Sequence, residues 1–118
     1  MSRIALFVAG VAAMLVLAAP SGAMGPTKLK GTVGPGFTIT LKKGTAKVKT
    51  LKAGKYSITV SDKSNIHNFH LKGPGVNKVI SATPFMGTKT VTVTLKKGIY
   101  RYVCDPHATV MKGSFRVT

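Results

Sequence analysis

Apolar and polar residues alternate with a period of two along much of the chain. Strict alternation appears in short segments at 37–41, 56–60, 91–95 and 114–117, and the segment 100–104 begins in the same way. Phe69 and Leu71 extend the same pattern to the middle of the chain. Successive side chains of a β-strand point to opposite faces of a sheet, so this alternation indicates strands that are buried on one face. The sequence therefore predicts an all-β fold.

Turns rich in glycine, proline and lysine separate the predicted strands at intervals of roughly eight to twelve residues. They lie at 31–36, 51–54 and 96–98. We find no helical pattern of useful length in residues 24–118. Short strands at this spacing are typical of a sandwich or barrel of roughly eight strands. We expect one such domain.

The first residues are apolar without alternation. Arg3 supplies one positive charge, and apolar or small residues fill positions 4–19. Small residues follow, so we interpret 1–23 as a secretory signal peptide that is cleaved near Ala23. The alternative is a retained membrane anchor, since the apolar run is just shorter than a usual membrane span. We expect residues 24–118 to be exported to the periplasm, the cell envelope or the exterior.

Charge and cysteine content exclude several kinds of site. The chain has 18 Lys+Arg and only two acidic residues, Asp62 and Asp105. Mechanisms that need two close carboxylates are excluded, and so is a carboxylate cage for Ca²⁺. One cysteine, Cys104, excludes an intrachain disulfide. A lone thiol is prone to oxidation outside the cytoplasm, which favours a thiolate bound to metal over an inert core cysteine.

Residues that bind soft metals gather around Cys104. His107 follows it by three positions and Met111 by four more, where a predicted strand ends. His67 lies far upstream, just before Phe69. Two imidazoles, one thiolate and one distant thioether form the donor set of blue-copper sites. His67, Cys104, His107 and Met111 are therefore candidate ligands of one copper ion that alternates between Cu(I) and Cu(II).

Strand alternation separates His70 from this set. If 67–71 is extended, His67 and Phe69 share one face while His70 points to the other. We expect His70 to be structural or exposed. The alternative is a Cys-His₃ zinc site, which needs a turn or bulge at Phe69 and leaves Met111 unused. Its ligands would be His67, His70, Cys104 and His107.

The chain resembles the cupredoxin family of small type I copper proteins, in the group of plastocyanin, pseudoazurin and amicyanin. The resemblance covers residues 27–118. It is carried by the pair His67-Asn68, by Tyr-Val-Cys-Asp-Pro-His at 102–107 and by Met111-x-Gly113. It implies a Greek-key β-sandwich or barrel of the cupredoxin type.

The same resemblance assigns roles to individual residues. It implies that the two histidines and the cysteine are equatorial copper ligands and that Met111 is the axial one. Asn68 would tie the strand of the first histidine to the ligand loop. In relatives its partner is often a hydroxyl just after the cysteine, and here that position is Asp105. Three residues separate His107 from Met111, whereas relatives commonly have two or four.

The resemblance implies an electron carrier that passes single electrons between redox partners and is not an enzyme. Copper delivery and the zinc-binding domain are the alternative functions. The whole chain has a formal charge of +16, and loss of Arg3 with residues 1–23 leaves +15. This charge predicts a redox partner with an acidic docking surface, or an anionic envelope surface. We expect a monomer that does not bind nucleic acid, since no nucleic-acid-binding module is present and scattered lysines also suit a solvated face.

Overall fold

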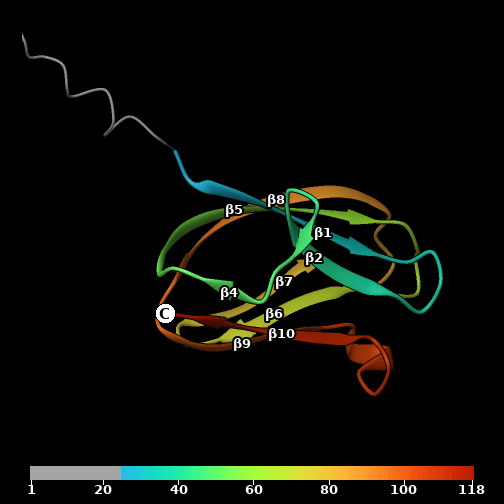
Figure 1. Cartoon of the computed structure of the whole chain (residues 1–118). Helices are drawn as coiled ribbons and strands as arrows, with labels where there is room; N and C mark the ends of the chain where they lie inside the picture. Colours follow the sequence, from blue (N-terminus) through green and yellow to red (C-terminus); the bar gives the residue numbers. More distant parts are fainter. Residues whose placement is uncertain (1–24) are drawn as a thin grey trace, which may run out of the picture.

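The alternating segments form the strands of two five-stranded sheets that pack face to face (Figure 1). The computed structural model describes residues 25–118. The first sheet, in the order β3-β2-β1-β5-β8, contains β1 (Thr27–Val33), β2 (Ile39–Lys43), β3 (Ala46–Lys47), β5 (Gly54–Asp62) and β8 (Gly87–Leu95). The second, in the order β4-β10-β9-β6-β7, contains β4 (Thr50–Leu51), β6 (Phe69–Gly73), β7 (Val76–Ser81), β9 (Gly98–Val103) and β10 (Lys112–Val117). A 3₁₀ turn at Asp105–His107 is the only helical element within 25–118, so the all-β prediction is confirmed.

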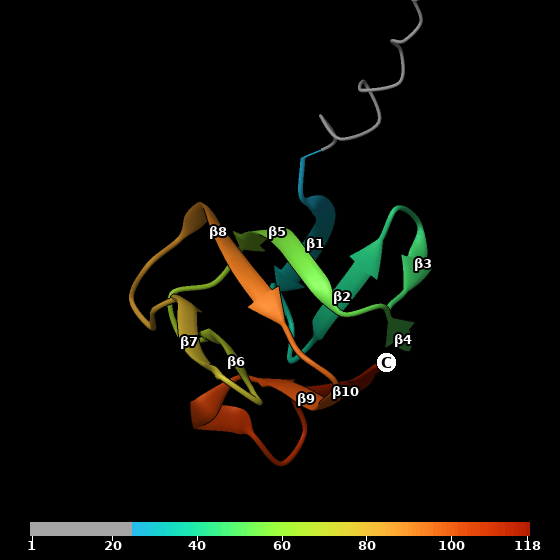
Figure 2. The ribbon, with the colours of Figure 1, turned by 90° about the vertical axis from the view of Figure 1, so that its left-hand side faces the viewer.

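Both sheets are mixed, because each contains one parallel pair of strands. β1 pairs in parallel with β5, and β10 pairs in parallel with β4. The remaining neighbours are antiparallel. Figure 2 shows the two sheets as separate layers, with β8, β5, β1, β2 and β3 above β7, β6, β9, β10 and β4.

Inward-facing residues of the alternating strands fill the space between the layers. In β5, Tyr56, Ile58, Val60 and Asp62 are buried while the residues between them are partly exposed. Two ring pairs stack between neighbouring strands of the second sheet: Phe69 on Tyr102 and Tyr100 on Phe115. Burial of this apolar surface is the main source of stability for such a sandwich.

Two glycines leave room for these rings. A Cβ at Gly113 of β10 would overlap the ring of Tyr102, and a Cβ at Gly73 of β6 would overlap the ring of Tyr100. Glycine lets a neighbouring aromatic ring lie directly over the backbone. The glycine of the Met-x-Gly motif therefore has a packing role in β10.

Two strand boundaries near the start of the fold differ from the sequence prediction. Residues Gly31, Thr32 and Val33 belong to β1, although the glycine and proline content predicted a turn there. Gly31 occupies an inward position, where the Phe69 ring fills the space that its side chain would take. β2 begins at Ile39, because the backbone N–H of Gly34 binds the carbonyl of Thr38 and closes a loop before the strand.

The predicted signal peptide at 1–23, and its alternative as a membrane anchor, lie outside the described residues. Within 25–118, no helix has the length and apolar character that a membrane span requires.

Candidate metal centre

Three of the four predicted metal-binding residues, His67, Cys104 and His107, meet at the end of the sandwich where the loop after β9 projects (orange-red in Figure 1). His67 lies two residues before β6, and Cys104 directly follows β9. His107 ends the 3₁₀ turn, and Met111 directly precedes β10. Strands β6 and β9 are neighbours in one sheet, so the upstream histidine is brought beside the cysteine loop.

Three donor atoms converge at this end. His67 Nδ1 lies 3.1 Å from His107 Nδ1. The sulfur of Cys104 lies 3.7 Å from His67 Nδ1 and 3.6 Å from His107 Nδ1. Within the described residues this is the one cluster of cysteine, histidine and acidic side chains with metal-binding geometry. Cys104 and His67 are buried, and His107 is partly exposed.

A carbonyl group fixes the orientation of the His67 ring. The Nε2 atom lies 3.1 Å from the carbonyl oxygen of Gly36, to which it donates a hydrogen bond. With the proton on Nε2, the lone pair of Nδ1 faces the sulfur of Cys104 and the ring of His107. A metal-binding histidine commonly uses its other ring nitrogen in this way.

The turn before His67 is shaped by short side chains. Ser64 N–H donates to Asp62 Oδ1 at 3.1 Å, and Ile66 N–H donates to Ser64 Oγ at 3.4 Å. Hydrogen bonds of this kind replace backbone pairing in turns. They fix the path of the chain from the end of β5 to His67.

Backbone hydrogen bonds close the loop between β9 and β10. His107 N–H donates to the carbonyl of Cys104, and Met111 N–H donates to the carbonyl of His107. Cys104 N–H donates in turn to the carbonyl of Met111. The Met111 side chain is fully buried. These bonds place the backbone of Met111 beside both ligand-type residues of the loop.

The three donor atoms suit a metal ion in size and chemistry. Their separations leave a point about 2 Å from each of them, which is close to the length of a metal–imidazole bond. A thiolate with two imidazoles is a donor set that copper and zinc both accept, and thiolate favours Cu(I). His70 does not join this cluster, so within 25–118 the structure does not assemble the four ligands of the Cys-His₃ alternative.

The Phe37 ring contacts the partly exposed His107, and two exposed apolar residues lie close to the two histidines along the chain. The Phe37 ring lies edge-on to His67 and to His107, with centroid distances of 5.4 Å and 4.9 Å. Phe37 is 60% exposed, and Val110 is 65% exposed. Ile66, beside His67 in the sequence, is also exposed. An apolar rim therefore borders the one ligand-type residue that reaches the surface.

Asn68 and Asp105 form a reciprocal pair between β6 and the loop. Asn68 Nδ2–H donates to Asp105 Oδ2 at 2.8 Å, and Asp105 N–H donates to Asn68 Oδ1 at 2.7 Å. The backbone N–H of Asn68 points to the sulfur of Cys104 at 3.5 Å. The asparagine thus joins the strand of His67 to the ligand loop, and Asp105 is its partner where relatives often have a hydroxyl.

The surroundings of Asp105 favour its ionised form. Burial raises the pKa of this carboxyl, but hydrogen bonds from Asn68 and His70 lower it, as does attraction to His70 and Lys72. The lowering effects win, so the pKa of Asp105 lies below its ordinary value. Asp105 is therefore a carboxylate at neutral pH.

Sequence reasoning overlooked Gly36, Phe37 and the contacts of His70. The sequence predicts a turn at Gly36 and a strand from Phe37, whereas their approach to His67 depends on how the β1–β2 loop folds against the turn before β6. A glycine and an aromatic residue after Gly34-Pro35 gave no signal of a metal site. For His70, the alternating pattern predicted the correct face but named no partner.

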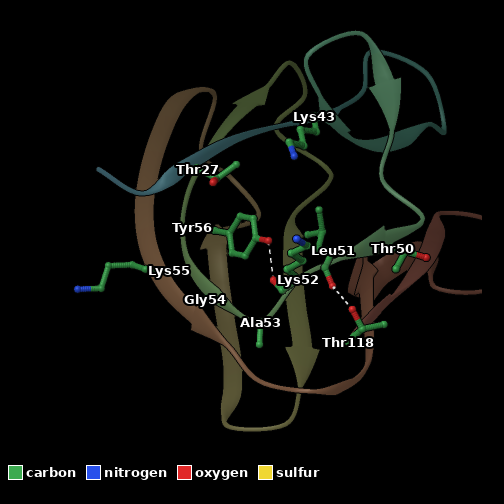
Figure 3. Close-up of a pocket in the computed structure, with 10 residues that line it drawn as sticks. All are labelled: Thr27, Lys43, Thr50, Leu51, Lys52, Ala53, Gly54, Lys55, Tyr56 and Thr118. Carbon is green, nitrogen blue, oxygen red and sulfur yellow. Dashed lines mark hydrogen bonds between the residues drawn. The ribbon is translucent and has the colours of Figure 1, made fainter. Parts of the chain in front are cut away.

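A cavity of about 650 Å³ lies at the opposite end of the sandwich (Figure 3). Its lining comes from the start of β1 and β5, from β4 and from the chain end at Thr118, and includes Lys43, Lys52 and Lys55. Tyr56 donates its hydroxyl hydrogen to the carbonyl of Lys52. The lining has no cysteine or histidine, so the candidate metal chemistry is confined to the other end.

Solved structures share this fold. Reduced rusticyanin at 1.9 Å resolution aligns with a TM-score of 0.55 and 25% identity, over 77% of this chain and 78% of rusticyanin. A rusticyanin variant aligns with a TM-score of 0.54 and 26% identity, over 77% of this chain and 76% of the variant. One chain of a heme-copper terminal oxidase dimer, 21% identical, has the same fold with a TM-score of 0.54 over 77% of this chain and 63% of that one. The cupredoxin-type sandwich is confirmed.

The family comparison agrees with the motifs around Cys104. Residues 38–118 match the family described as copper binding proteins, plastocyanin/azurin family. This span includes all the strands that position the histidine and cysteine cluster except β1. A comparison with curated proteins finds no match. The chain therefore belongs to the plastocyanin/azurin family of copper binding proteins, as its sequence resemblance predicts.

Proposed function

We propose that this protein is an exported type I copper protein that carries single electrons between redox partners. The convergence of His67 Nδ1, His107 Nδ1 and the Cys104 sulfur carries the proposal. These residues would be the equatorial ligands of one copper ion per chain, and Met111 would be the axial ligand. A copper ion in such a site supplies one-electron exchange between Cu(I) and Cu(II).

The residues around the donors favour a rigid site. Gly36 holds the ring of His67, and the backbone bonds of the loop hold Cys104, His107 and Met111. The donor atoms therefore have little freedom to rearrange when an electron arrives or leaves. Small rearrangement suits an electron carrier, and the chain offers no pair of close carboxylates for hydrolytic chemistry. We propose an electron carrier and not an enzyme.

The partly exposed ring of His107 offers the shortest path from the donor cluster to the surface. Phe37, Ile66 and Val110 form the apolar rim around it, which suits close approach of another protein. The surrounding chain is strongly cationic. We propose that a redox partner with an acidic surface docks here, in the periplasm or elsewhere in the cell envelope.

The metal and the visible spectrum test this function. The full chain should bind one Cu(II) per molecule and show intense thiolate-to-copper absorption, which a reductant removes. Cys104→Ser should abolish the colour, because an alcohol is not a soft charge-transferring ligand. Colourless protein that binds stoichiometric zinc and rejects copper would contradict the proposal.

Salt dependence tests the acidic partner. Attraction between the cationic chain and an acidic redox protein should raise the bimolecular electron-transfer rate at low ionic strength, and added salt should lower it. Stopped-flow rates measured across a salt series provide the test. A rate that stays flat or rises with salt would show that the positive charge serves another purpose.

A further inference from the structure

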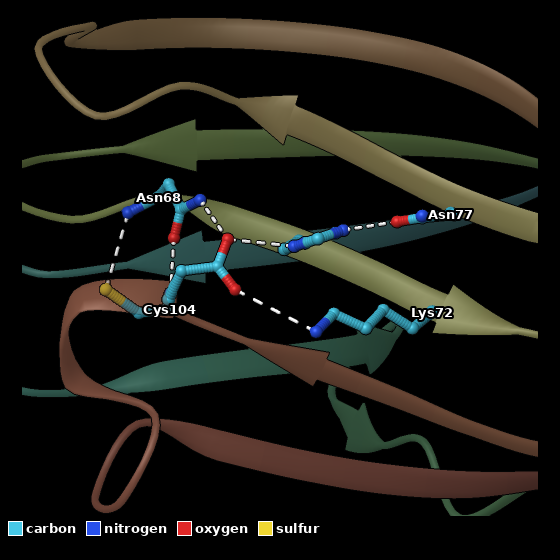
Figure 4. Close-up of polar contacts among 6 residues, drawn as sticks. Asn68, Lys72, Asn77 and Cys104 are labelled. Carbon is cyan, nitrogen blue, oxygen red and sulfur yellow. Dashed lines mark hydrogen bonds and ion pairs between the residues drawn. The ribbon is translucent and has the colours of Figure 1, made fainter.

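A chain of polar contacts runs from the surface of β7 to the candidate copper ligand Cys104 (Figure 4). It begins at Asn77 on β7 and passes to His70, on the face of β6 that points away from the core. Nε2 of His70 lies 2.6 Å from Asn77 Oδ1, and Nδ1 lies 2.8 Å from Asp105 Oδ2. The carboxylate can only accept, so Nδ1 donates to Asp105 and Nε2 faces the side-chain amide of Asn77; only 14% of the His70 side chain is exposed. The ring has no freedom to turn without losing one of these contacts.

The carboxylate of Asp105 carries the constraint from His70 to Asn68. Its Oδ2 atom accepts hydrogen bonds from both His70 and Asn68. Without His70, this half-exposed carboxylate could turn toward solvent or toward Lys72, whose Nζ lies 4.0 Å from Oδ1. The buried Asn68 amide would then lose its acceptor, which is costly for a buried polar group.

Asn68 carries the constraint to the sulfur. The Oδ1 atom binds the N–H of Asp105, the residue directly after Cys104. The backbone N–H of Asn68 points to the Cys104 sulfur. The side chain and the backbone of Asn68 therefore hold the same two-residue segment of the loop. A shift of the side chain changes the distance between that N–H and the sulfur.

We propose that His70 is a positioning residue of the copper site, which holds Asp105 against Asn68 and so fixes the N–H···S hydrogen bond to Cys104. The inference rests on the proposed copper function. It gives His70 a role through Asp105 and Asn68, with no contact to the metal.

Loss of His70 should lower the reduction potential. Hydrogen bonding to the cysteine sulfur is one of the factors that set the potential of a blue-copper site. An N–H that donates to the sulfur withdraws electron density and favours Cu(I), so a weaker bond favours Cu(II). A carboxylate beside Cys104 that loses its histidine partner also favours Cu(II). The weaker N–H···S bond and the loss of the histidine partner should therefore both lower the reduction potential.

Four copper-loaded full-length proteins test the inference: the wild type, His70→Ala, His70→Gln and Lys78→Ala. Lys78 lies on β7 near Asn77 and takes no part in the contact chain, so its variant controls for a changed surface on the same hairpin. We expect His70→Ala to keep the thiolate-to-copper colour with a shifted band and a lower potential. His70→Gln retains a side-chain donor and should recover part of the shift, whereas Lys78→Ala should match the wild type.

Spectra, redox titrations and denaturant unfolding at one pH separate positioning from a merely structural role. If His70→Ala unfolds more easily but has the band and potential of the wild type, the inference is overturned. Should His70→Ala not fold, Asn77→Ala keeps the ring and removes its far partner. That variant should show a smaller shift of the same sign, and an unchanged potential would overturn the inference. A wild-type chain that binds no copper would overturn the proposed function itself, which is a different result from a blue wild type and an unchanged variant.

Discussion

The two ends of the sandwich are built from the same strands but differ in chemistry. At one end, the β1–β2 loop, the turn before β6 and the β9–β10 loop meet at two histidines and a cysteine. At the other, lysines and threonines line an open cavity around Tyr56. Residues that link strands bind one another at both ends, as Ala53 N–H binds the carbonyl of Thr118 at the second, but only the first end brings donor side chains together. The site thus depends on loops that a stable scaffold holds.

Removal of a metal-donor side chain should give the largest difference between the two ends of the sandwich. His67→Ala should abolish or grossly alter the coloured site, since the ring is one of three convergent donors. Lys52→Ala, at the opposite cavity, should leave copper content and colour unchanged. Metal analysis and visible spectra of both variants provide the test. Loss of copper in the lysine variant would mean that the ends are not independent.

Gly113 and Gly73 each lie beneath a tyrosine ring, and they allow a matched comparison of the two ends of the sandwich. Gly113→Ala and Gly73→Ala should each destabilise the fold by about 1–3 kcal/mol, because the new methyl group overlaps a buried ring. Only Gly113 lies near the metal end, two residues after Met111, so Gly113→Ala alone should also shift the copper absorption band. Denaturant unfolding and visible spectra measure the two effects.

Gly36→Ala is the control for this comparison. A Cβ at Gly36 meets no atom within 4 Å, so the variant should unfold close to the wild type. If all three alanine variants lose the same stability, ring overlap is not the cause.

Substitution of Met111 should give a smaller and more specific effect. Met111→Leu should retain the colour and raise the reduction potential, since a thioether ligand stabilises Cu(II) more than Cu(I). Met111→Gln should lower the potential, because an oxygen ligand favours Cu(II). Redox titration measures both shifts. Near-identical potentials for the two variants would mean that Met111 only packs in the core.

The sequence predicted those strands in which buried apolar residues alternate with exposed polar ones. Segments 56–60 and 91–95 lie within β5 and β8. β7 escaped prediction because Val76–Ser81 does not alternate: three consecutive residues of this strand are exposed. β1 escaped because Gly31 stands where an apolar side chain would have marked the inward face.

For the metal site, the types of residue and their spacing along the chain were more informative than the alternation of apolar and polar positions. Cys104, His107 and His67 could be named as donors because few residue types bind copper and they lie at recognisable intervals. The carbonyl that orients His67 could not be named, since any residue at position 36 would supply one. Likewise, the contact between His70 and Asp105 joins positions 35 residues apart in the sequence and depends on the pairing of β6 with β9.

The parallel pairs β1–β5 and β4–β10 have a consequence for how the chain reaches its final form. Thr27 pairs beside Tyr56, and Thr50 beside Arg116, so these contacts close long stretches of chain. Closing long loops costs entropy before any contact is gained, and all-β domains of this kind fold in roughly milliseconds to seconds. The donor atoms come from either side of β6 and β9, so the nascent chain has no complete set of ligands until those strands pair. Copper uptake, followed in time, should therefore report the pairing of β6 with β9.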